Sequence, residues 1–311
     1  NDIVLSRQPV ILEKGANHLE ATFRIKNPRL WWCNGMGEQN MYDFSAQIVA
    51  ENKVIASQND RIGLRTIRLE QEKDQWGRSF RFILNGVPVY AKGVNVIPFD
   101  NILSDVTPET YRRNLEPAAQ ANMNMLRVWG GGIYETDEFY RQCDSLGLMI
   151  WQDFIFSCTM YPSEGQLLET MREEFADNIR RIRNHPSLAL WCGSNELEYS
   201  WASKKLRTMN TQENMDKIWQ MYLDQNKAIH EALDTLCPEI CYQPSSPFRG
   251  YGKNKSPYEG DYHSWSVLSG SKPITYFEEG FSRFYSEYGY ESFDYYESLV
   301  RYAPGEEDQR I

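Results

Sequence analysis

The strongest constraint on the fold is a regular alternation of short apolar runs and longer amphipathic segments from about residue 93 to residue 290. The apolar runs include "MLRV", "LMIWQD" and "LALWC", and the segments between them carry apolar residues at helical spacing. Short runs that are apolar on both faces are typical of strands in a parallel sheet covered by helices. The pattern therefore predicts an α/β fold built from parallel βα units.

Two parallel architectures fit this alternation, an open doubly wound sheet and a closed (β/α)8 TIM barrel. An open dinucleotide-binding sheet should have a Gly-rich turn after its first strand, and "GVNV" is followed by none, while "WGGG" lacks the G-x-G-x-x-G spacing. Instead, polar or aromatic residues end almost every predicted strand, namely Asn95, Arg127, Trp129, Asp153, Asn195, Glu196, His263, Trp265 and Glu287. Strand ends of a barrel converge on the face that carries active sites, so we predict the barrel.

The first 70 residues have a different pattern. The runs "HLEATFRIK", "MYDFSAQIVA" and "RIGLRTIRLE" alternate apolar and polar residues, which predicts a small antiparallel β-sandwich. The charged stretch "EQEKDQWGR" reads as a linker, so the predicted domains are 1–70 (immunoglobulin-like sandwich) and 71–311 (barrel). A hairpin turning at Asn85-Gly86 is expected just after the linker.

Composition and charge exclude several classes of function. The net charge of -10, without a basic cluster, disfavours nucleic acid as a partner, and no apolar run is long enough to span a bilayer. The six cysteines match no zinc spacing and are expected to be free thiols, and the four histidines form no metal motif, so we expect neither metal nor cofactor. Aromatic residues make up 14%, and a surplus of Trp and Tyr suits flat, amphipathic ligands such as sugars.

Two glutamates at strand ends, Glu196 and Glu287, indicate glycoside chemistry. Cleaving an acetal requires one protonated carboxyl group and one ionised carboxylate. Retaining enzymes hold the two groups roughly 5 to 5.5 Å apart and inverting enzymes roughly 6.5 to 9.5 Å. Alternatively, Glu196 is a loop carboxylate beside the next helix and Glu287 an edge carboxylate. Glu198 is read as a supporting or solvated group.

Several segments together resemble the β-mannosidase branch of glycoside hydrolase family 2. They are "NPRLWWCNGMGEQNMY", "KGVNVIPFD", "MLRVWGGGIYE", "WQDFIFSCTMYP", "GSNE", "GDYHSW" and "SEYG". The resemblance runs from about Asn27 to Ser292 and implies a retaining exo-enzyme that removes terminal β-D-mannosyl residues from the non-reducing end of oligosaccharides. It also implies a sugar-binding domain before the sandwich.

The resemblance implies a role for each site residue. Glu196 would be the general acid/base and Glu287 the nucleophile, Asn195 would bind the sugar 2-hydroxyl, and Arg127 would keep the nucleophile ionised. Trp129 would shape the sugar subsite, and His263 and Trp265 would line the pocket. The competing interpretations are a core packing role for Trp129, a structural ion pair between Arg127 and Asp153, and a pocket histidine that does not bind substrate.

The chain also departs from the family pattern. Only 24 residues follow Glu287 (311 − 287), so we expect a fragment whose barrel lacks its last strand and helix, and for which inactivity is favoured. Cys33 stands where the family would have Pro, at what we expect to be a surface loop. The alternatives in function are another family 2 exo-glycosidase, a β-galactosidase or exo-β-glucosaminidase, and a noncatalytic carbohydrate-binding piece. A periplasmic, secreted or lysosomal location is favoured over the cytoplasm.

Overall fold

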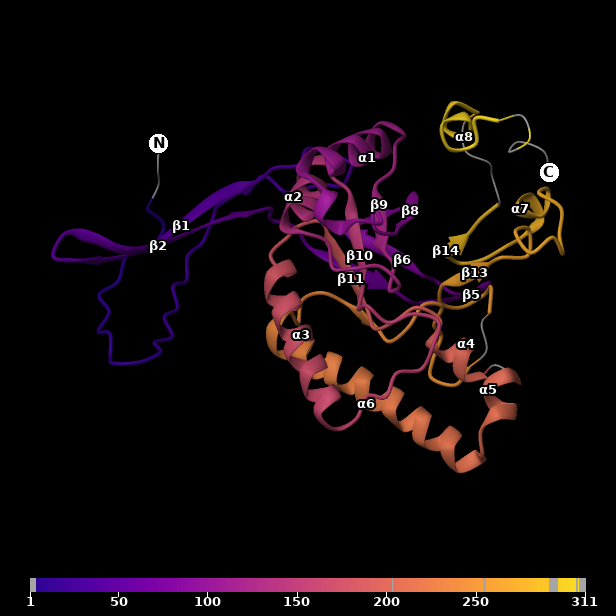
Figure 1. The fold of residues 1–311 in the computed structure, drawn as a ribbon. Helices are drawn as coiled ribbons and strands as arrows, with labels where there is room; N and C mark the ends of the chain where they lie inside the picture. Colours follow the sequence, from indigo (N-terminus) through magenta and orange to yellow (C-terminus); the bar gives the residue numbers. More distant parts are fainter. Residues whose placement is uncertain (1–3, 203, 254–255, 291–295, 306, 308–311) are drawn as a thin grey trace.

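The computed structural model describes residues 4–202, 204–253, 256–290, 296–305 and 307. Parallel strands follow one another in the sheet order β12-β11-β10-β9-β8, and β13 pairs with β14 in a second parallel sheet (Figure 1). These strands are β8 (Gly93–Val96), β9 (Met125–Val128), β10 (Met149–Asp153), β11 (Leu188–Cys192), β12 (Tyr242–Gln243), β13 (Tyr262–Ser264) and β14 (Tyr285–Tyr288). Strands that are consecutive in the chain are neighbours in the sheet, as in a barrel and unlike a doubly wound sheet.

The parallel strands also bend back toward their starting point. The Asn95 side chain of β8 donates a hydrogen bond to the backbone oxygen of Ser286 in β14 at 3.0 Å. The first and the last of these strands are therefore neighbours in space. Together with the strand order, this contact confirms the predicted incomplete (β/α)8 barrel.

Helices lie between the strands along the chain. They are α1 (Pro108–Gln120), α2 (Asp137–Leu146), α3 (Gly165–Ile182), α4 (Leu197–Ala202), α5 (Lys204–Met209), α6 (Gln212–Leu236), α7 (Tyr276–Glu279) and α8 (Tyr296–Tyr302), with a 3-10 turn η1 (Leu103–Asp105) after β8. Pro108 occupies the first turn of α1, behind a Thr107 capping box. Gly147 ends α2 with φ +73°, the left-handed conformation that glycine adopts without strain. No helix among the described residues is long and apolar enough to cross a membrane.

The strands are buried on both faces, as the apolar runs predicted. Every residue of β9, β10 and β11 is buried. On β10 the side chain of Gln152 points toward the helices, because it accepts a hydrogen bond from the hydroxyl of Tyr140 in α2 at 2.7 Å. Since side chains alternate along a strand, Trp151 and Asp153 face the barrel interior.

The N-terminal segment contains one antiparallel ribbon, β1 (Tyr42–Ala50) paired with β2 (Lys53–Ile62), which extends away from the barrel (Figure 1). The predicted antiparallel pairing is thus confirmed for these two strands. The run at residues 18–26, expected to be extended in the same sandwich, contains no strand. Val49, Val54 and Ile55 are more than half exposed, because no second sheet covers the ribbon within residues 4–65.

A small antiparallel sheet lies between the ribbon and the barrel in the chain. It comprises β3 (Ile67–Glu70), β6 (Arg81–Leu84) and β7 (Val87–Val89), and beside it β4 (Lys73–Asp74) pairs with β5 (Gly77–Arg78). The predicted hairpin is confirmed, with Asn85 and Gly86 at φ +50° and +80°. Phe80 stacks on Trp151 at 5.9 Å, so the sheet closes one end of the barrel. The sheet joins residues on both sides of position 70. The domain boundary between residues 70 and 71 stays a prediction.

Residues 31–34 connect the N-terminal segment to the barrel. The indole N–H of Trp31 donates to the backbone oxygen of Asp144 at 2.8 Å, and the Asn34 amide donates to the backbone oxygen of Ala119 at 2.8 Å. Cys33, placed on a surface loop by the sequence, is instead fully buried in the core. Its neighbours dock on α1 and α2, and this docking removes the loop from solvent.

Candidate active site

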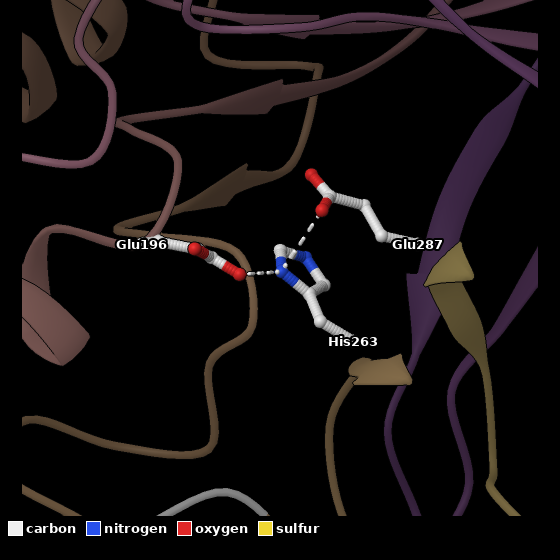
Figure 2. A group of neighbouring side chains, drawn as sticks. All are labelled: Glu196, His263 and Glu287. Atoms are coloured by element: carbon white, nitrogen blue, oxygen red, sulfur yellow. Dashed lines mark hydrogen bonds and ion pairs between the residues drawn. The ribbon is translucent and has the colours of Figure 1, made fainter. Parts of the chain in front are cut away.

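Three ionisable side chains from three different strand ends meet at one point of the barrel (Figure 2). Glu196 follows β11, His263 lies in β13 and Glu287 lies in β14. Glu196 has φ +57°, a left-handed conformation that costs a non-glycine residue about 1 to 2 kcal/mol. Its backbone N–H donates to the oxygen of Ser246 at 2.8 Å, which holds this turn in place.

The imidazole of His263 stands between the two carboxylates. Its Nδ1 lies 2.6 Å from Oε1 of Glu196 and 3.3 Å from Oε2 of Glu287. One oxygen of each glutamate and a ring nitrogen all lie within 4.8 Å of one another. An approach this close of one oxygen from each carboxylate agrees with the closely spaced carboxyl groups, roughly 5 to 5.5 Å apart, of retaining glycosidases.

Arg127 provides the positive charge of the site. Its guanidinium donates to Oε1 of Glu287 at 2.6 Å, to Oδ2 of Asp153 at 2.8 Å and to Oδ1 of Asn195 at 2.8 Å. Burial alone would lower the pKa of Arg127, but the carboxylates of Asp153 and Glu287 raise it above its ordinary value. The arginine is therefore charged, and it forms a buried ion pair with Glu287.

Asp153 and Asn195 hold the guanidinium from the other side. Asp153 is fully buried and also accepts hydrogen bonds from the Gly130 N–H at 3.0 Å and the Trp151 indole at 2.9 Å. The ion pair suspected from the sequence is thus present, and it belongs to the site because the same arginine binds Glu287. The Asn195 amide nitrogen points toward Ser157 at 3.3 Å, so its orientation is set from two directions.

The two tryptophans follow the ends of two strands, β9 and β13. Trp129 follows β9 and is half-buried, and its ring covers Gly131 so closely that a Cβ there would lie 2.0 Å from the ring. Trp265 follows β13 and is 38% exposed. With Arg127 it lines a cavity of about 380 Å³ between β8, β9 and β14. Sugar contacts by either ring stay predictions.

Glu198 lies in a smaller hollow, which Glu196 also lines. It accepts hydrogen bonds from the Tyr222 hydroxyl at 3.1 Å and from the Gly252 N–H at 3.2 Å. Burial raises its pKa to about 7, despite these two bonds. Of the two interpretations made from the sequence, a supporting group fits these contacts and a solvated surface carboxylate does not.

Sequence reasoning missed a polar network behind His263. Nε2 of the ring lies 3.0 Å from Oγ of Ser246, which contacts Asp261, and Asp261 contacts Ser286. The signal was available in "GDYHSW", because residues 261 and 263 face the same side of a strand. Ser246 and Ser286 lie outside that motif, and no sequence pattern marked them as part of the network.

Glu196, His263 and Glu287 are also close enough together to hold a metal ion. The Arg127 guanidinium, 2.6 Å from Glu287, already supplies the compensating positive charge and would repel a cation at this point. We therefore interpret the group as a proton-transfer site. The six cysteines are free, and four of them are buried.

Two family models match the chain. The model described as "Glycosyl hydrolases family 2" matches residues 3–65, and the model described as "Glycosyl hydrolases family 2, TIM barrel domain" matches residues 78–244. The matched regions correspond to the N-terminal antiparallel segment and to most of the parallel barrel.

Curated relatives agree with these two family matches. "Beta-mannosidase B" of Emericella nidulans is 36% identical over 300 residues, which make up 94% of this chain and 35% of the relative. "Beta-mannosidase B" of Aspergillus fumigatus is 37% identical over 298 residues, covering 93% of this chain and 35% of the relative. The chain thus spans about a third of the length of these relatives.

Solved structures show the same fold. The crystal structure of a beta-D-mannosidase from Dictyoglomus thermophilum superimposes with a TM-score of 0.82 at 37% identity, covering 91% of this chain and 34% of that one. A Bacteroides uniformis beta-glucuronidase 2 superimposes with a TM-score of 0.58 at 18% identity, covering 70% of this chain and 24% of that one. The second likeness concerns the fold alone.

Proposed function

We propose that this chain, which belongs to glycosyl hydrolase family 2, forms the catalytic centre of a retaining exo-β-mannosidase. The observation that carries the proposal is the meeting of Glu196 and Glu287 at His263, with carboxylate oxygens within 4.8 Å. The chain covers about a third of the named mannosidases, so the activity is proposed for the whole protein that contains it.

Hydrolysis proceeds in two displacements. In the first, Glu196 gives its proton to the glycosidic oxygen while a carboxylate oxygen of Glu287 attacks the anomeric carbon; the bond from that carbon to the leaving oxygen breaks and a glycosyl ester forms. In the second, water attacks the same carbon, Glu196 takes the water proton and the ester bond to Glu287 breaks. Two inversions at one carbon retain its configuration.

The surrounding groups match the needs of these steps. The Arg127 guanidinium donates to one oxygen of Glu287 at 2.6 Å and fixes it, which leaves the other oxygen for attack. Asn195, held by Arg127 at 2.8 Å, is assigned to the sugar 2-hydroxyl, where hydrogen bonds strengthen in the transition state. Trp129 and Trp265 are assigned to the walls of the sugar subsite.

The sugar specificity rests on the relatives. Proteins named β-mannosidase match at 36% and 37% identity, whereas a neighbour named for glucuronide cleavage matches at 18%. We therefore propose terminal β-D-mannosyl units of oligosaccharides as the substrate, in a protein that also carries a sugar-binding domain before residue 1. Other family 2 specificities lack support at comparable identity.

The test is covalent labelling with a fluorinated β-mannosyl inactivator in the natural protein that carries this chain. Its slow second displacement should leave one sugar on Glu287, located by mass spectrometry of the peptide. Glu287→Gln should lose labelling and turnover, and Glu278→Gln, a matched glutamate outside the site, should keep both. Labelling of another residue would overturn the assignment.

Specificity is tested with a panel of nitrophenyl glycosides. The β-mannoside should be cleaved faster than the β-galactoside, β-glucuronide and β-glucosaminide. Preferential cleavage of one of the others would refute the substrate while leaving the mechanism intact.

A further inference from the structure

We propose that Asp261 is a positioning residue of the catalytic centre. Through Ser246 and Ser286, its buried carboxylate fixes the ring of His263 and the strand that carries Glu287. The inference rests on the proposed function for its catalytic meaning, while its structural content is independent of it.

Asp261 accepts hydrogen bonds on both carboxylate oxygens. Oδ1 accepts from the Gln243 amide at 2.9 Å and from the Phe248 backbone N–H at 2.8 Å. Oδ2 accepts from the hydroxyls of Ser246 and Ser286, both at 2.5 Å. The residue is only 1% exposed, so this charge is stabilised by four donors rather than by water. A carboxylate with a donor at each of these positions is held rigidly.

These four bonds span a gap in the barrel. Gln243 lies in β12 and Ser286 lies in β14, whereas Asp261 immediately precedes β13. Within the described ranges, no backbone ladder joins β12 to β13. The carboxylate therefore ties β12 to the β13-β14 pair, which backbone hydrogen bonds leave unconnected, directly beside the site.

The bond to Ser246 also determines which nitrogen of His263 carries a proton. A serine hydroxyl has one hydrogen, and at 2.5 Å it is donated to Asp261. The same oxygen lies 3.0 Å from Nε2 of His263, so it must accept a hydrogen bond from an Nε2–H group. In the neutral ring, Nδ1 then carries the lone pair.

That assignment places the unprotonated nitrogen of the neutral ring beside the two catalytic carboxyl groups. Nδ1 lies 2.6 Å from Oε1 of Glu196 and 3.3 Å from Oε2 of Glu287. With the Nε2–H group held by Ser246, Nδ1 accepts a hydrogen bond from the protonated Glu196 carboxyl group, which orients the proton that Glu196 gives to the glycosidic oxygen. Asp261 thus acts on the acid/base through Ser246 and His263, without touching substrate.

Ser286 extends the same control to the nucleophile. It directly precedes Glu287 in β14, and its hydroxyl donates to Asp261 while its backbone oxygen accepts from Asn95. A shift of β14 by about 1 Å can reduce turnover on the order of 100-fold, because the attacking oxygen must stay aligned with the anomeric carbon.

The first test is kinetic. Asp261→Asn keeps the size but presents an NH₂ group that cannot accept from a hydroxyl. We expect kcat for the β-mannoside to fall roughly 100-fold with KM changed less than about threefold, and labelling of Glu287 to slow in parallel. The matched control is Asp144→Asn, since Asp144 is also a buried carboxylate, bound to His185 at 2.6 Å and to the Ser187 N–H at 3.1 Å. Its loss should reduce stability but leave kcat unchanged.

The second test reads the tautomer without any activity. This chain has four histidines, and the ¹⁵N-labelled ring of His263 is assigned by the signal that a His263→Gln variant loses. Where the ring is neutral, His263 should be in the Nε2–H form in the unsubstituted protein, and Ser246→Ala or Asp261→Asn should shift it toward Nδ1–H.

The possible outcomes separate this inference from the proposed function. An Nδ1–H ring in the unsubstituted protein, or wild-type kcat in folded Asp261→Asn, would overturn the positioning role. A protein with the expected tautomer but no glycosidase activity would support the positioning of His263 and refute the proposed function.

Discussion

Replacing Arg127 with Met should destabilise the protein more strongly as the pH rises. The guanidinium contacts Asp153 at 2.8 Å and Glu287 at 2.6 Å, and the three side chains are at most 7% exposed. Met occupies similar space without charge, so two carboxylates are left buried without their cation. Removing one partner of a buried ion pair typically costs about 3 to 5 kcal/mol.

The pH dependence follows from the way in which the variant neutralises one of the two buried carboxylates. It can protonate Asp153, whose pKa in the unfolded chain is about 3.9, at a free-energy cost of about 1.4 kcal/mol per pH unit above that value. The cost is about 4 kcal/mol at pH 7 and about 1.5 kcal/mol at pH 5. The folded variant then binds a proton that the unfolded chain releases, so its stability falls as the pH rises. Protonation of Glu287 as well would double the slope.

The assay is urea unfolding of both proteins at pH 5, 6 and 7, compared at each pH. The control is Arg65→Met, because Arg65 is a largely buried arginine that donates to the backbone oxygens of Pro186 and Leu188 at 3.0 and 2.6 Å. No carboxylate of the described residues forms an ion pair with Arg65, and those of Glu239 and Asp144 interact with it only at longer range, so the destabilisation should be nearly independent of pH. The same pH independence in Arg127→Met would refute the charge argument.

Two further predictions concern stability. Because burial raises the pKa of Glu198 from 4.5 to about 7, the folded state holds a proton that the unfolded chain loses, and stability should fall by up to about 3 kcal/mol between pH 4.5 and 7. Glu198→Gln should remove this fall in a melting series from pH 4 to 8; curves parallel to those of the unsubstituted protein would contradict it. Gly93→Ala places a Cβ 1.6 Å from the Met125 backbone oxygen, so β8 and β9 must separate, at about 3 kcal/mol or more. Gly86→Ala, with φ +80° and open space, should cost only about 1 kcal/mol in the same denaturant assay, and equal losses would count against the steric argument.

Much of the barrel could be predicted because each of its strands has a local signal in the sequence. A short apolar run such as Leu188–Cys192 is buried on both faces, and helix signals such as Pro108 and Gly147 act within one turn. The N-terminal segment was harder to predict, since alternating residues specify a strand without specifying its partner. Residues 18–26 have the alternation, but no strand of the described segment pairs with them.

The residue types of the site were visible in the sequence, and their distances were not. Strand ends carrying Glu196, Arg127 and Glu287 indicate acid/base chemistry, because a parallel barrel gathers its strand ends on one face. The placement of His263 between the two glutamates depends on residues 67 and 24 positions away from it along the chain. Asp261, an unremarkable acidic residue in the sequence, becomes a buried acceptor for four donors only when β12 and β14 approach it.

The strand and helix order of the barrel, the family and the two candidate carboxyl groups could be read from the sequence alone, because these depend on local periodicity and on residue type. The groups that lie within hydrogen-bonding distance, and the carboxylates that Arg127 faces, follow from the folded structure. Interactions between charges fall off with distance and strengthen with burial, and both quantities arise when segments distant in the chain pack together.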